Sequence, residues 1–134
     1  MKIGNFDLNE DVMVVAEIGN NHEGNFDTAK RLTEMAAECG VDAVKFQTFK
    51  TELYVSHSDT ARFDRLKSFE LNYSQFERLS ELAHSLGLLF ISTPLDLKSG
   101  EFLRSIVDCY KIASGDNNFF PLINQVVQTE KPVM

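Results

Sequence analysis

Short apolar runs alternate with amphipathic segments along this chain. The runs Val12–Ala16, Ala43–Gln47, Leu88–Ser92 and Tyr110–Ala113 have the length and composition of strands. Continuous apolar strands of this kind are typical of a sheet that is covered on both faces. Because a segment with helical periodicity separates most of these strands, the pattern predicts a parallel β/α architecture.

The segments between the strands are predicted to be helices. Residues 28–39 end before Gly40, and a second helix opens with a capping box formed by Ser74 and Glu77 and ends at Gly87. The inward face of the first helix is expected to carry Ala29, Leu32, Met35 and Ala36. Further elements are expected as a hairpin at 1–11, helices at 98–107 and 121–129, and the start of a fifth strand at 131–134.

The periodicity lapses over residues 48–73, which form a long polar stretch. Loops longer than about 12–15 residues are usually functional lids or contain short helices of their own. We therefore expect this stretch to be a lid or to hold short helices. No internal sequence repeat or low-complexity segment is evident.

The length of the chain allows two architectures. A complete (β/α)8 barrel typically needs about 250 residues, about twice the 134 residues present. A closed doubly wound sheet of five strands fits the length instead. Composition and periodicity do not separate these alternatives.

Composition excludes several classes of function. The net charge of −7 disfavours binding to nucleic acid or to an anionic membrane surface. There is neither a run of about 20 apolar residues nor a signal-peptide core, so we expect a cytoplasmic protein. Cys39 and Cys109 lie far apart in the sequence and are expected to be buried free thiols.

Polar and ionisable residues gather where the predicted strands end. Parallel β/α folds collect their chemistry at the carboxyl ends of the strands. The polar residues at or near these ends are Glu17, Asn20, Asn21, His22, Lys45, Gln47, Ser92, Thr93, Lys111, Ser114 and Asp116. Lys45 and Lys111 lie inside apolar strands, where an unpaired ammonium is costly.

Two interpretations of these lysines remain open. Either each forms an ion pair with Glu17 or Asp116, or both converge with Thr93 and Ser114 on a phosphate or carboxylate. His22 is a candidate metal ligand or acid–base group, although its neighbours also fit a plain turn.

The strand-end motifs resemble the sialic acid synthase (N-acetylneuraminate synthase) family. The resemblance rests on Ala16–Gly24, Val44–Thr48, Phe90–Pro94 and Tyr110–Asp116, and it covers the chain from about Val12 to Met134. It implies a TIM-type parallel (β/α)8 barrel, of which this chain would be the first half, strands 1 to 4 with the start of strand 5. It also implies a transferase that condenses phosphoenolpyruvate with N-acetylmannosamine or a related sugar and releases phosphate.

The resemblance assigns roles to individual residues. Phosphoenolpyruvate would be held by Lys45, Thr93, Lys111 and Ser114. Glu17 and Gln47 would face the sugar or a metal-bound water. Asp116 stands where many family members carry Glu, in a position to manage a proton near the reacting carbons.

The family also implies parts that are not expected in residues 1–134. These are the two His ligands of a divalent manganese or magnesium ion, and a C-terminal antifreeze-like domain that covers the partner's site in a domain-swapped homodimer. An isolated chain of this kind is expected to lack activity, and the alternative is a non-catalytic half-barrel that binds phosphate-bearing ligands or associates with itself. It is also expected to be marginally stable, because axis-facing residues among Val14, Ala16, Val44, Phe46, Phe90 and Ile112 would meet water.

Overall fold

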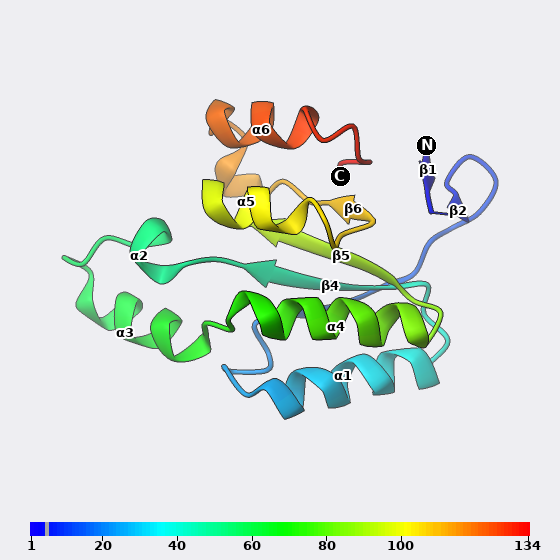
Figure 1. Ribbon diagram of the computed structural model, residues 1–134, viewed down its shortest axis with the longest axis horizontal. Coiled ribbons are helices and arrows are strands. Elements are labelled where there is room, and N and C mark those ends of the chain that lie inside the picture. The colour runs from blue at the N-terminus through cyan, green and yellow to red at the C-terminus, as the bar shows by residue number, and fades with distance from the viewer. Residues whose placement is uncertain (5) are drawn as a thin grey trace.

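The computed structural model describes residues 1–4 and 6–134, and its main feature is one parallel sheet (Figure 1). The strands follow one another in sequence order. They are β3 (Val15–Gly19), β4 (Ala43–Thr48), β5 (Leu89–Pro94) and β6 (Cys109–Tyr110). A doubly wound sheet reverses its strand order at a switch point. The unbroken order therefore supports the barrel-type alternative.

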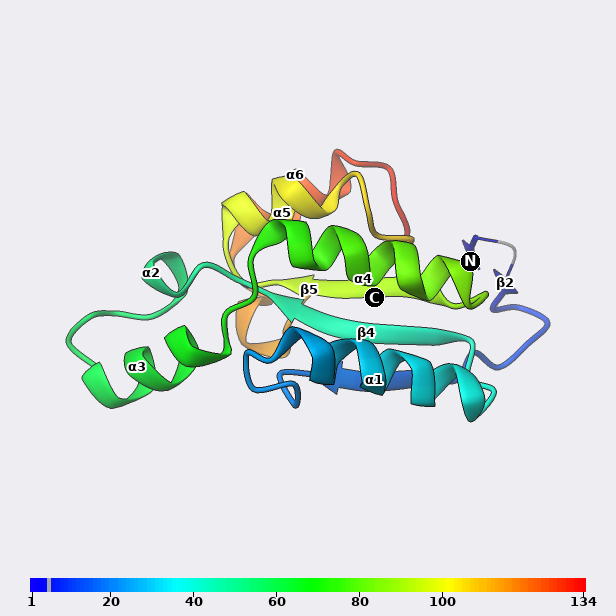
Figure 2. The same ribbon diagram turned by 60° about the horizontal axis from the view of Figure 1, so that its bottom comes forward.

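Helices from every β/α connection pack on one face of this sheet (Figures 1 and 2). They are α1 (Phe26–Glu38), α4 (Tyr73–Ser85), α5 (Leu97–Leu103) and α6 (Phe120–Val127). Their apolar residues join those of the strands in a single core cluster. Helices on one side of a sequentially ordered parallel sheet are the arrangement of a (β/α)8 barrel wall, so the predicted fold class is confirmed.

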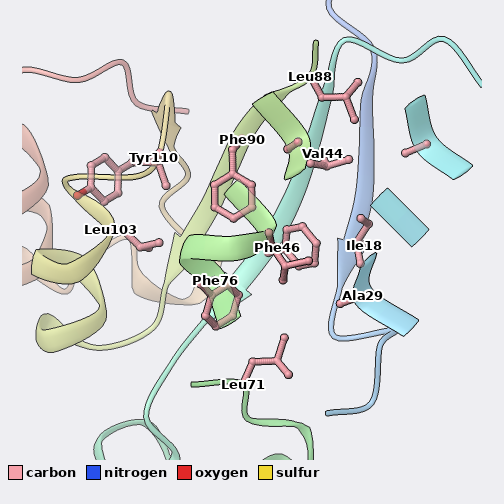
Figure 3. Packing of buried hydrophobic residues seen from close by; sticks show 14 of the residues in the cluster. Ile18, Ala29, Val44, Phe46, Leu71, Phe76, Leu88, Phe90, Leu103 and Tyr110 are labelled. Carbon is pink, nitrogen blue, oxygen red and sulfur yellow. The ribbon is translucent and has the colours of Figure 1, made fainter. Parts of the chain in front are cut away.

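The centre of this core is aromatic (Figure 3). Phe46 of β4 lies edge-on to Phe76 of α4, with ring centroids 6.3 Å apart, and stacks on Phe90 of β5 at 5.5 Å. Phe46 and Phe90 are completely buried. Of the six strand residues among which axis-facing ones were expected to meet water, Phe46 and Phe90 are therefore not axis-facing, because they point to the helices and alternate positions of the same strands point to the axis.

The axial face is covered at one end by the amino-terminal hairpin, which was predicted. Strands β1 (Lys2–Ile3) and β2 (Phe6–Asp7) pair antiparallel. Ile3 is fully buried in a second cluster. The other buried members of that cluster are Ala43, Ile91 and Cys109. The apolar end of the barrel interior therefore lies under a cover that the chain itself provides.

Several element boundaries differ from the prediction. The capping box that opens α4 is formed by Asn72 and Gln75 rather than by Ser74 and Glu77, because the Asn72 carboxamide accepts from the Gln75 backbone and the Gln75 side chain reaches back. The strand predicted at 12–16 begins later, at Val15, and the helix predicted at 98–107 ends at Leu103. The fifth strand is represented by a parallel bridge between Tyr110 and Val133.

The long polar stretch contains two short helices, which confirms one of the two alternatives expected for it. Helices α2 (Thr51–Tyr54) and α3 (Thr60–Phe69) project beyond the carboxyl ends of the strands (Figures 1 and 2). We call residues 51–69 the arm. α3 has no buried residue. The arm is thus attached mainly at its base.

Glu70 fastens the two ends of the arm together. Its carboxylate accepts hydrogen bonds from the Thr51 backbone N–H at 2.9 Å and from the Thr51 hydroxyl at 2.8 Å. It also contacts the ammonium groups of Lys50 at 3.1 Å and Lys67 at 3.2 Å. Burial alone would raise the pKa of Glu70, but these hydrogen bonds outweigh it and lower the pKa to about 2.

A short internal repeat underlies two of the strands, although none was evident from the sequence. Val41–Phe46 and Val107–Ile112 share the pattern Val-Asp-x-x-Lys followed by an apolar residue. In each copy the Asp carboxylate accepts a hydrogen bond from a backbone N–H of the preceding strand segment, Asp42 from Val14 and Asp108 from Phe90, both at 2.7 Å. The repeat therefore places Lys45 and Lys111 at equivalent positions.

The flank of β3 and α1 is more open than the helical pattern predicted. Met35 and Cys39 are exposed, whereas both were expected to be buried. Within the described residues β3 has a strand neighbour on one side only. A hollow of about 330 Å³ lies here, between Leu32, Met35 and Val41.

Candidate functional site

The predicted site residues of the first three strands share the axial face of the sheet. Strand pairing sets Glu17 beside Lys45, and one level higher it sets Gln47 beside Thr93. Lys111 directly follows β6, and its backbone N–H donates to the Ser92 carbonyl at 3.1 Å. The pairing of Ser92 with Tyr110 places Lys111 at the level of Thr93. Both lysines therefore lie on one face, towards the carboxyl ends of the strands.

Lys45 forms an ion pair with Glu17 across neighbouring strands. The Lys45 side chain is only 14% exposed, whereas that of Glu17 is 51% exposed. The ion-pair interpretation is thus confirmed for Lys45. Lys111 and Asp116 form no such pair within the described part of the chain, so the positive charge of Lys111 has no carboxylate partner there.

Thr93 carries a buried hydroxyl that has no hydrogen-bond partner in the described residues. The residue is 3% exposed. Buried hydroxyls are nearly always hydrogen-bonded, so an unpartnered one indicates a missing ligand or water. Its neighbour Ser92 points to the opposite face, where it bonds to the Thr48 hydroxyl at 2.8 Å. Of these two adjacent hydroxyls, only Thr93 is available on the axial face.

Gln47 is held by Asn20, which was noted near the end of its strand but was given no role. The Asn20 side-chain NH₂ donates to the Gln47 side-chain oxygen at 3.0 Å. Asn20 lies in the loop after β3, next to a register shift between Glu17 and Gly19. The Asn20 side-chain oxygen is buried without a partner in the described residues.

Ser114 and Asp116 lie beyond the end of β6, in a single 3-10 turn, η1 (Ser114–Asp116). Ser114 is exposed and Asp116 is half-buried. Neither side chain forms a hydrogen bond to Lys45, Gln47 or Thr93. These two residues are therefore at the predicted end of the sheet but outside the contacts that join β3 and β4.

His22 is buried behind the site rather than in it. Its ring lies 6.2 Å from that of Phe46, which belongs to the helix-side core. Nδ1 accepts from the Gly24 backbone N–H at 3.1 Å, as in the plain turn that was one of the alternatives. Burial lowers the pKa of His22, which favours the neutral form of the ring.

The acidic, histidine and cysteine side chains of residues 1–4 and 6–134 do not assemble a metal centre. No group of three or more of them lies close enough together to hold an ion. The carboxylate nearest the site centre, Glu17, is already paired with Lys45. A divalent ion would therefore not fit these residues by themselves.

No helix of the described chain is long and apolar enough to cross a membrane.

The arrangement suits a small ligand with two chemically different ends. Lys45, Lys111 and Thr93 can donate hydrogen bonds and offset negative charge. Glu17 and the Asn20 oxygen can only accept. An anionic group and a hydroxylated group could therefore be held side by side above the strand ends.

Comparisons with known proteins point to one family. The model of the NeuB family matches residues 32–134. An uncharacterized protein of Methanocaldococcus jannaschii is 44% identical over 93% of this chain and 37% of its own length. The N,N'-diacetyllegionaminic acid synthase of Legionella pneumophila is 36% identical over 90% of this chain and 38% of its own length.

Solved structures agree with the sequence comparison. The N-acetylneuraminic acid synthetase of Leptospira borgpetersenii, determined in complex with citrate, superimposes with a TM-score of 0.93 at 29% identity. The superposition covers 99% of this chain and 47% of the Leptospira chain. The chain thus spans less than half the length of these relatives.

Proposed function

Because this chain belongs to the NeuB family, we propose that it is the amino-terminal half of the catalytic barrel of a phosphoenolpyruvate-dependent sugar-acid synthase. The complete enzyme, a C–C bond-forming transferase, would condense phosphoenolpyruvate with N-acetylmannosamine or a related N-acetylated hexosamine and release phosphate. The observation that carries this proposal is the buried, unpartnered Thr93 hydroxyl between the strands of Lys45 and Lys111.

Phosphoenolpyruvate matches the donor-rich part of the site. At neutral pH its phosphate and carboxylate offer only negatively charged acceptors. The Thr93 hydroxyl and the Lys111 ammonium lack partners in the described residues and can donate to them. Lys45 would exchange Glu17 for the ligand. Ser114, whose side chain is exposed, would donate a further hydrogen bond to the same anion.

The protein groups would contribute mainly by position and charge. Fixed ammonium groups that offset the ligand's negative charge in a partly dry site lower the barrier without reorganising during the reaction. The enol carbon would attack the open-chain sugar aldehyde, and water would then attack the resulting cation before phosphate leaves. Asp116 would hold a proton near these carbons, and Glu17, once released from Lys45, would face the sugar together with Gln47.

The remaining parts belong to the same proposal. A divalent manganese or magnesium ion, whose ligands would come from other parts of the complete enzyme, would supply Lewis-acid chemistry there. That enzyme would be a cytoplasmic homodimer with an antifreeze-like domain and without nucleic-acid or membrane partners. The isolated chain would bind ligand but would not turn it over.

Titration of the isolated chain with phosphoenolpyruvate tests this proposal. We expect saturable binding by NMR or calorimetry, competed by inorganic phosphate. K45M should weaken it by about tenfold or more, because loss of a charged hydrogen bond of about 1.5–3 kcal/mol is expected. K2M is the matched control, since Lys2 is 74% exposed in the hairpin at the other end of the sheet. Equal affinity of K45M and K2M would contradict the proposal.

The open flank of β3 and α1 favours the second candidate, a half-barrel that associates with itself. Met35, which lines the apolar hollow, is 45% exposed, and Val14, which directly precedes β3, is 54% exposed. One edge of β3 has no strand partner among the described residues. Unpaired edge strands promote association. Sedimentation velocity at low micromolar concentration would show a dimer or larger species in this case, and M35K should restore a monomer.

A further inference from the structure

The loop after β3 brings three polar side chains together at an irregularity in the strand. The register of β3 against β4 shifts between Glu17 and Gly19. Gly19 has a φ of +54°, and a Cβ there would lie 3.0 Å from the Glu17 carboxylate oxygen and 3.7 Å from the Gln47 side-chain nitrogen. The bulge therefore directs Glu17 and Gln47 towards one space, which only a glycine leaves open.

Asn20 borders this space with its side-chain oxygen unpaired. Its NH₂ group is already used, because it donates to the Gln47 oxygen at 3.0 Å. Because the NH₂ end makes this bond, the oxygen is the end of the Asn20 carboxamide that remains free to accept a hydrogen bond. The remaining Oδ1 is buried and has no partner in the described residues. A buried acceptor without a donor is costly, so a donor is expected from outside the chain.

We infer that Asn20 is a specificity-determining residue that accepts a hydrogen bond from a hydroxyl or amide N–H of the sugar acceptor. This inference rests on the proposed function and names a residue of its acceptor subsite. Phosphoenolpyruvate has no donor at neutral pH, and the neighbouring Glu17 carboxylate repels it further. Asn20 thus selects a donor-rich, polyhydroxylated ligand and discriminates against a second anion.

Two substitutions separate this role from a structural one. N20L keeps the approximate volume but removes both the acceptor and the bond to Gln47. N20D keeps an oxygen at the Oδ1 position, and the Gln47 carboxamide can turn its NH₂ group to the new carboxylate. N124L serves as the matched control, because Asn124 is exposed on α6.

The experiment is an NMR titration of the ¹⁵N-labelled chain, first with phosphoenolpyruvate and then with N-acetylmannosamine at saturating phosphoenolpyruvate. For N20L we expect about tenfold weaker sugar binding, the loss of roughly one well-made hydrogen bond, with phosphoenolpyruvate affinity unchanged within about twofold. N20D should bind the sugar within about threefold of the wild type. N124L should match the wild type for both ligands, and the amide spectra should stay native away from the loop.

Each contrary result has its own meaning. If N20L binds the sugar as well as the wild type does, or if N20D loses as much as N20L, Asn20 does not accept a bond from the sugar. If the wild type binds phosphoenolpyruvate but no sugar, the inference fails while the anion site stands. If the wild type binds neither phosphoenolpyruvate nor inorganic phosphate, the proposed function itself fails.

Discussion

On the helix-covered face of the sheet, Val44, Phe46 and Phe90 are completely buried among side chains of the helices. The axial face of the same strands changes character along its length. Ala43 and Ile91 pack against Ile3 of the hairpin, and Ile91 is paired directly with Lys45, so the polar site residues begin at that level and continue towards the carboxyl ends. The helix-covered face is thus mainly apolar, with the paired hydroxyls of Thr48 and Ser92 as its polar exception, and the axial face carries both apolar and polar residues.

This difference arises from the two-residue period of a β-strand. In β4 the side chains at 44 and 46 pack against helices, while those at 45 and 47 face the axis. Neighbouring residues therefore serve packing and chemistry separately. Substitutions on the two faces should consequently have different effects, and four predictions follow this contrast.

The largest effect is expected from F46A on the helix-covered face. Removing a fully buried ring that contacts Phe76 and Phe90 should lower the free energy of unfolding by about 3–5 kcal/mol. K45M, one position away, should change it by less than about 1 kcal/mol, because its methylene groups can still pack. Urea denaturation measures both. Similar losses for the two variants would show that the faces are not energetically distinct.

A smaller effect is expected at the base of the arm. E70Q should lower stability by about 1–3 kcal/mol at pH 7, because the hydrogen bonds to Lys50 and Lys67 lose their charge. The pKa of Glu70 is lowered to about 2, so its contribution is complete above the ordinary carboxyl range near pH 4.5 and is lost as the pH falls towards 2.

Thermal melts across pH 2–7 would test this dependence. The difference in stability between the wild type and E70Q should shrink steadily below about pH 4.5. E77Q is a suitable control, since Glu77 is exposed on α4. A difference that is constant with pH would contradict the role of the Glu70 charge.

On the polar half of the axial face, T93V should separate stability from binding. Valine has nearly the same shape and removes a buried hydroxyl that has no partner. Stability should be unchanged or should rise by up to about 1 kcal/mol, while phosphoenolpyruvate binding weakens about fivefold. A T93V protein that is clearly less stable would mean that the hydroxyl already has a structural partner, such as a buried water.

The smallest perturbation is chemical labelling of the two cysteines. Cys109 lies in the sealed half of the axial face, and burial raises its pKa to about 11. Cys39 is exposed. At pH 8 a disulfide reagent should titrate one thiol rapidly and the second at least about a hundredfold more slowly. Two equally fast thiols would show that the hairpin does not seal the axial face.

The sequence pattern predicted the order and type of the elements well, because helical periodicity and short apolar runs depend on local residues. The pattern did not show which face of the sheet, or of a helix, each apolar residue occupies. Which of the six apolar strand residues, Phe46 and Phe90 among them, face the axis was left open, although the polar Lys45 and Gln47 at alternate positions of β4 were a usable signal. Met35 was expected to be inside, but 45% of it is exposed in the described part of the chain.

The sequence predicted the site residues that lie at strand ends, because the strands themselves could be predicted. The location of Lys45, Gln47 and Thr93 on one face follows from strand parity and the parallel order. Asn20 was noted near a strand end but was given no role, because an asparagine in a loop looks like a turn residue. Its bond to Gln47 depends on how β3 and β4 align in space. The Glu70 contacts were missed for the same reason, since they join residues 50, 51 and 70 across the arm.

The amino-terminal hairpin has a consequence for how the chain folds during synthesis. Ile3 is synthesised well before two of its buried neighbours, Ile91 and Cys109, which lie 88 and 106 positions later in the sequence. Contacts between such distant parts of a chain form slowly, because a long loop must close before they are gained. The hairpin therefore cannot dock, and its Ile3 side chain stays exposed, until β5 and β6 have formed. Its docking would be a late step of folding, and nascent chains arrested before Cys109 would expose a surface that chaperones bind.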